Sequence, residues 1–80
     1  MMIHRLDFET SKGKRWTMTP IDLDDAGLSH KIMQSISKNS GLMSSNKEFT
    51  FDMDSGEGQI IVGGARVVGS IKLVTLEVSE

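Results

Sequence analysis

Three cations beside an indole are the residues of this chain best suited to do chemistry. Lys12, Lys14 and Arg15 lie in a predicted turn, and Trp16, the one tryptophan, follows them. Cations beside an aromatic ring can grip phosphate and stack on a base of single-stranded nucleic acid. Trp16 has the strand parity of Met18, however, which favours a place in the core. We therefore expect cations open to an acidic partner and an indole packed inside.

The two histidines give little support for a metal site or for acid–base catalysis. His4 and His30 are the two histidines, they lie far apart in the chain, and there is no cysteine. A protein zinc site gathers about four ligands, from residue types that are scarce here. His4 falls on the apolar face of a predicted strand and His30 on a predicted helix, so we expect one packed and one solvated histidine. We predict no metal site.

The acidic and glycine-rich stretches favour turns over ligand sites. Asp52 to Glu57 has the composition of a calcium loop, but such a loop needs glycine at its sixth position and glutamate at its twelfth. Counted from Asp52, those positions hold Glu57 and Gly63. The later glycines precede strand patterns, whereas a phosphate-binding loop leads into a helix. We expect hairpin turns at Asp54–Gly58 and Gly63–Gly64, and we predict no cofactor.

Nucleophilic catalysis also lacks its usual parts. No serine stands in a Gly-x-Ser-x-Gly elbow, and the chain has no cysteine and few histidines. Eighty residues allow a single domain, residues 1–80, with a small core and little room for a pocket. We predict that the protein is not an enzyme.

Charge and hydropathy narrow the classes of partner that this chain could bind. The net charge is −2; residues 1–40 carry six Lys or Arg against five acids, and residues 41–80 carry three against six. Neither half has the basic excess of a nucleic-acid-binding domain, so we expect no nucleic-acid partner. No apolar run is long enough for a membrane helix, and Asp7 stands where a signal peptide is apolar. We predict a cytoplasmic protein without a membrane partner.

Periodicity predicts the elements that position these residues. Alternation over 2–9 and 15–19 favours an N-terminal hairpin, and residues 48–53, 60–62 and 65–78 favour three further strands. Residues 44–46 form a linker loop. Between the two groups of strands lies one helix, whose apolar stripe is Leu28, Ile32 and Ile36.

The start of this helix has two candidates. Thr19–Pro20 offers one cap, and Asp24 offers another for a helix that starts at Asp25. We favour Asp24, because the acids suit a first turn. Lys38 suits the last turn and Gly41 the position after the end. The chain is therefore predicted to be α+β: a single ββαβββ domain, whose largely antiparallel five-stranded sheet carries the helix on one face.

The last strand is the exception to simple alternation. Ile71 and Leu73 share one parity, whereas Val74, Leu76 and Val78 share the other. Either a bulge near residue 73 changes the phase, or a partner covers the second face. A strand this rich in aliphatic residues pairs readily with another chain when it lies at a sheet edge. We favour a homodimer or a tight complex with another protein through this strand.

These patterns predict a small non-enzymatic interaction protein. It could be an inhibitor, an immunity protein or an accessory factor, such as phages and other mobile elements encode. The predicted partner-binding residues are Lys12, Lys14, Arg15, Val74, Leu76 and Val78. The alternative is a nucleic-acid-binding module that uses the Lys12–Trp16 hairpin.

Overall fold

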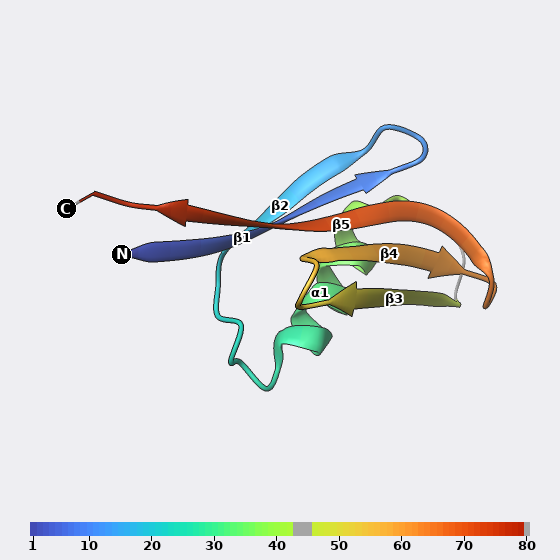
Figure 1. Cartoon of the computed structure of the whole chain (residues 1–80). Coiled ribbons are helices and arrows are strands. Elements are labelled where there is room, and N and C mark those ends of the chain that lie inside the picture. The colour runs from blue at the N-terminus through green and yellow to red at the C-terminus, as the bar shows by residue number, and fades with distance from the viewer. Residues whose placement is uncertain (43–45, 80) are drawn as a thin grey trace.

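Five strands in one antiparallel sheet and one helix make up the part of the chain that the computed structural model describes, residues 1–42 and 46–79 (Figure 1). The sheet order is β2-β1-β5-β4-β3. The predicted α+β fold, ββαβββ, is confirmed, whereas Ser44 and Ser45 of the predicted linker lie outside the described residues. In chain order the elements are β1 (Met2–Thr10), β2 (Arg15–Ile21), α1 (Leu28–Asn39), β3 (Lys47–Asp52), β4 (Glu57–Val62) and β5 (Arg66–Glu77).

The core forms where α1 packs on one face of the sheet. Leu6 and Phe8 of β1 share that face, since alternate residues of a strand point the same way. Ile32 and Ile36 of α1 lie against them and are 2% and 0% exposed. The predicted helical stripe is thus confirmed. The buried apolar residues are Leu6, Phe8, Ile32, Ile36, Ile60, Val68 and Ile71.

Trp16 ties the N-terminal hairpin to the core. Its ring stacks on Phe8, with 5.0 Å between the ring centroids and 4° between the planes. Its Nε1–H donates a hydrogen bond to Ser35 Oγ of α1 at 2.8 Å. The predicted packing of Trp16 into the core is confirmed, so its ring is already occupied within the fold.

The helix begins later than predicted. We expected Asp24 to cap a helix starting at Asp25, but α1 begins at Leu28, and Gly27 precedes it without a side-chain cap. Aspartate side chains can bond backbone N–H groups two residues ahead, which stabilises turns at the expense of helix. The acids before α1 do this, so they hold the chain outside the helix.

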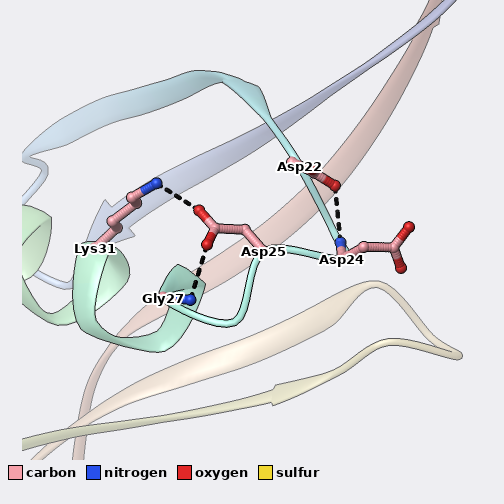
Figure 2. A network of polar contacts seen from close by, with 5 residues as sticks. All are labelled: Asp22, Asp24, Asp25, Gly27 and Lys31. Carbon is pink, nitrogen blue, oxygen red and sulfur yellow. Dashed lines mark hydrogen bonds and ion pairs between the residues drawn. The ribbon is translucent and has the colours of Figure 1, made fainter.

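Two such side-chain turns are visible in Figure 2. Asp22 Oδ1 accepts a hydrogen bond from the Asp24 N–H at 2.9 Å, and Asp25 Oδ1 accepts one from the Gly27 N–H at 2.8 Å. Asp25 Oδ2 also forms an ion pair with Lys31 Nζ. The contact with Lys31, followed by the bond from Gly27, holds the pKa of Asp25 below its usual value.

Glycines supply the backbone conformations that the turns require. Gly63 and Gly64 have φ of +62° and +80° in the loop between β4 and β5, and Gly41 has φ of +69° after the helix. These values lie in the left-handed region that favours glycine. The predicted hairpin turn and helix end are confirmed.

The C-terminal strand lies at the centre of the sheet, between β1 and β4. β5 pairs with β1 over 69–77 and with β4 over 66–72. The strand is twice as long as β4, so β4 cannot cover all of it. A sequence pattern identifies a strand but not its neighbours, because those depend on contacts far along the chain.

The bulge in β5 is not near residue 73. The pairing of β5 with β4 shifts between Ile60 and Ile61, which leaves Val68 as an additional residue and buries it. The pairing with β1 is continuous from Gly69 to Glu77. The phase of β5 is therefore unchanged along this stretch, and its mixed-parity apolar residues do face opposite sides of the sheet.

Candidate interaction surface on the terminal arm

The two ends of the chain meet in a two-stranded extension of the sheet, which we call the terminal arm and define as residues 1–5 and 74–78. Figure 1 shows it projecting from the helix-covered part of the sheet, with the N- and C-termini at its tip. Arg5 lies opposite Val74 and Ile3 opposite Leu76. The Val78 N–H donates a hydrogen bond to the Met1 carbonyl at 2.8 Å.

Aliphatic side chains gather on the face of the arm turned away from α1. Buried Leu6 faces the helix, so Ile3, at odd spacing from it on the same strand, faces the other way. Leu76, directly opposite Ile3, shares its face, and Val74 and Val78 follow at spacings of two. We call this set the aliphatic cluster, and it includes Val74, Leu76 and Val78 of the predicted site.

The arm also holds most of the exposed large apolar side chains. Leu76 is 40% exposed, Val78 39% and Met1 74%, while Ile3 and Val74 are half-buried. In the described part of the chain six large apolar side chains are exposed, and four of them lie on the arm. An apolar surface concentrated in this way is typical of an interaction site. The four are Met1, Met2, Leu76 and Val78.

Residues 74–77 of β5 have a free edge. The Leu73 N–H points towards β4 and donates to the Gly56 carbonyl at 2.7 Å, whereas the Val78 N–H points towards β1. Backbone groups alternate sides along a strand, so those of Thr75 and Glu77 point away from β1. Among the described residues no strand pairs with this side of 74–77. Such an edge is a template for another strand.

Polar contacts hold the base of the arm. Arg5 Nε and Nη2 donate to Asp7 Oδ1 and Oδ2 at 2.7 and 3.1 Å, and this pairing raises the pKa of Arg5 above its ordinary value. On the opposite face His4 Nδ1 lies 3.0 Å from Thr75 Oγ1. His4 is half-buried, close to the packed position expected for it. A bidentate pair orients Arg5 beside the aliphatic cluster.

The three predicted cations do not form one patch. Lys12 is exposed at the turn. Lys14 extends towards the end of α1, where a Cβ added to Gly41 would lie 2.8 Å from its Nζ. Arg15 Nε instead pairs with Glu9 Oε2 at 3.1 Å, and both of these side chains are largely exposed. The cations therefore diverge from the hairpin tip.

The predicted site residues fall into two separate places. The hairpin tip and the arm lie at opposite ends of β1, and nine residues of strand span about 25–30 Å. Sequence reasoning missed Ile3, Thr75 and Glu77. Ile3 was detectable as an apolar residue on the polar face of its strand, whereas the free backbone of Thr75 and Glu77 depends on where β4 ends.

The remaining candidate sites stay close to their expected structures. Asp52 Oδ1 accepts a hydrogen bond from the Asp54 N–H at 2.9 Å, so the acidic stretch contains a turn, as predicted, although Glu57 and Gly58 of the predicted turn already belong to β4. His30 is exposed on α1, also as predicted. In residues 1–42 and 46–79 no three His, Cys, Asp or Glu side chains gather to hold a metal ion. No helix there is long and apolar enough to cross a membrane.

Comparisons with known proteins give no match. No family model, no curated protein and no solved structure is significantly similar to this chain.

Proposed function

We propose that this protein is a small non-enzymatic interaction protein that binds a protein partner through the terminal arm. It belongs to the class of inhibitors, immunity proteins and accessory factors that phages and other mobile elements encode. The supporting observation is that exposed aliphatic side chains and a free strand edge coincide in residues 74–78. Strand addition to an edge draws affinity from main-chain hydrogen bonds and specificity from alternate side chains.

The hairpin tip is at most a second contact area. Lys12, Lys14 and Arg15 are available to an acidic partner that also reaches this end of the molecule. The nucleic-acid alternative has less support, because Trp16, the ring it requires, stacks on Phe8 and donates a hydrogen bond to Ser35.

A capture experiment with a label far from the arm tests the proposal. Met1 and Val78 both lie in the arm, so a tag at either end of the chain would interfere with it. Ala65→Cys instead gives a unique thiol in the exposed β4–β5 loop of this cysteine-free chain. Three biotinylated chains are each incubated with lysate of the native host. They are the parent with Ala65→Cys, the same chain with Leu76→Lys, and the same chain with Val67→Lys. Val67 is the matched control, since it is an aliphatic residue of β5, 51% exposed and outside the arm.

We expect a protein that is recovered with the parent and with Val67→Lys but lost with Leu76→Lys. Equal recovery with all three chains, or recovery of no other protein, contradicts the proposal. A cytoplasmic location is part of the same proposal, and fractionation of the host tests it.

A further inference from the structure

We infer that one partner of the terminal arm is a second copy of this chain, paired antiparallel along residues 74–78 about a twofold axis at Leu76. The inference rests on the proposed function and names a partner for the same surface. A twofold contact requires a patch that is complementary to itself. The arm meets this requirement in its backbone, its side chains and its length.

The free backbone groups select the register. In the β5 half of the arm, residues 74–78, Thr75 and Glu77 are the residues whose N–H and C=O groups point to the open edge of β5. In an antiparallel pair, residues that exchange hydrogen bonds face each other. With Leu76 on the axis, Thr75 of each copy faces Glu77 of the other, and all of these groups are satisfied.

The side chains agree with this register. Leu76 faces Leu76 at the axis, and Val74 of each copy faces Val78 of the other. The two aliphatic clusters then form one continuous surface, on the face where these side chains are exposed in the single chain. Thr75 and Glu77 meet on the opposite face, which is wet, and the two Glu77 carboxylates are not directly opposite each other. Such cross-strand pairs are the units that stabilise a sheet.

The neighbouring strand excludes the next register. An axis at Thr75 would bring Glu77 of one copy opposite Leu73 of the other. The Leu73 N–H is already bonded to the Gly56 carbonyl, and β4 lies beside Lys72. The open edge therefore begins at Val74 and accommodates the five residues up to Val78.

Solution mass and one pair of variants test the dimer. Sedimentation and light scattering of the untagged chain over a range of concentrations should give twice the monomer mass. Leu76→Lys places two ammonium groups at the axis, so its dissociation constant should rise by about 100-fold. Val67→Lys, on the same face of the same strand, should dimerise like the parent. Circular dichroism confirms that both variants fold.

Amide hydrogen exchange, measured by NMR, identifies the register because it shows which backbone N–H groups the dimer protects. Exchange at Thr75 and Glu77 should slow as protein concentration rises, because only the dimer bonds these N–H groups. Exchange at Val74 and Leu76 should be insensitive to concentration, because their N–H groups are bonded to β1 within one chain. A dimer that leaves Thr75 and Glu77 unprotected overturns the inference.

The outcomes separate this inference from the proposed function. A parent chain that stays monomeric at high micromolar concentration, or a dimer that survives Leu76→Lys, overturns the self-pairing. If arm-dependent capture of another protein persists in that case, the proposed function stands. If the parent forms a dimer that Leu76→Lys weakens, but no other protein is captured through the arm, the self-pairing is supported and the proposed binding of another protein is contradicted.

Discussion

Gly69 shows how a single missing side chain permits the sheet to form. A Cβ added there would lie 2.7 Å from the Glu9 carbonyl oxygen and 3.0 Å from Ile60 Cδ1. A glycine within a strand often marks such a close approach. We predict that Gly69→Ala lowers the free energy of unfolding by about 1–3 kcal/mol, since backbone must move to accept the methyl group. Urea denaturation measures this, and Ser70→Ala, at the exposed neighbour, should change it by less than about 0.5 kcal/mol.

Asp25 makes the turn before α1 sensitive to pH. Its pKa is lowered in the folded state, so its carboxylate stabilises the fold above the ordinary aspartate pKa, and this contribution is lost as pH falls through the lower folded value. We predict that Asp25→Asn lowers Tm at pH 7 and that the difference from the parent disappears once the pH falls below the lowered pKa of Asp25. Asp24→Asn, at an exposed carboxylate, is the control. A difference that persists at the lowest pH contradicts the assignment.

The helix depends on one buried face. Ile32 is 2% exposed beneath the sheet, whereas Gln34 is exposed on the opposite side of α1. We predict that Ile32→Asp unfolds the domain, because burying an unpaired carboxylate costs several kcal/mol, which is comparable to the stability of so small a protein. Gln34→Asp introduces the same charge and should keep the parent melting curve. Lys31 is a poorer control, because it pairs with Asp25.

The elements that sequence could predict are those set by local pattern. The alternation around Leu6 and Phe8 and the stripe through Ile32 identified the strands and helix that form the core. The start of α1 was wrong, because Asp25 bonds the Gly27 N–H instead of entering the helix. The central position of β5 could not be predicted from local pattern either, because its pairing with β1 joins residues from opposite ends of the chain. Parity nevertheless identified the exposed aliphatic residues of the arm correctly.

At the scale of the whole molecule, the two predicted contact areas should act independently. The hairpin tip lies at the far end of β1 from the arm, and the ion pair of Arg15 with Glu9 at that tip joins exposed groups of little energetic value. We predict that the triple variant Lys12→Ala, Lys14→Ala, Arg15→Ala folds normally and keeps the dissociation constant of the parent dimer. Binding of an acidic partner should weaken and lose part of its salt dependence. Loss of the dimer in this variant would place self-association at the hairpin.

The terminal arm is the part of the molecule that the core does not require. The buried apolar residues extend from Leu6 to Ile71, so a chain that ends at Leu73 keeps all of them. We predict that this truncated chain folds, with the free energy of unfolding lowered by about 2 kcal/mol as the first residues of β1 lose their partner. It should be monomeric and inactive in partner capture, whereas a chain ending at Val78 should match the parent in both. Urea denaturation and sedimentation distinguish these results. If the chain ending at Leu73 is unfolded, the arm is needed for the fold, and its exposed aliphatic residues are not evidence of a separate binding role.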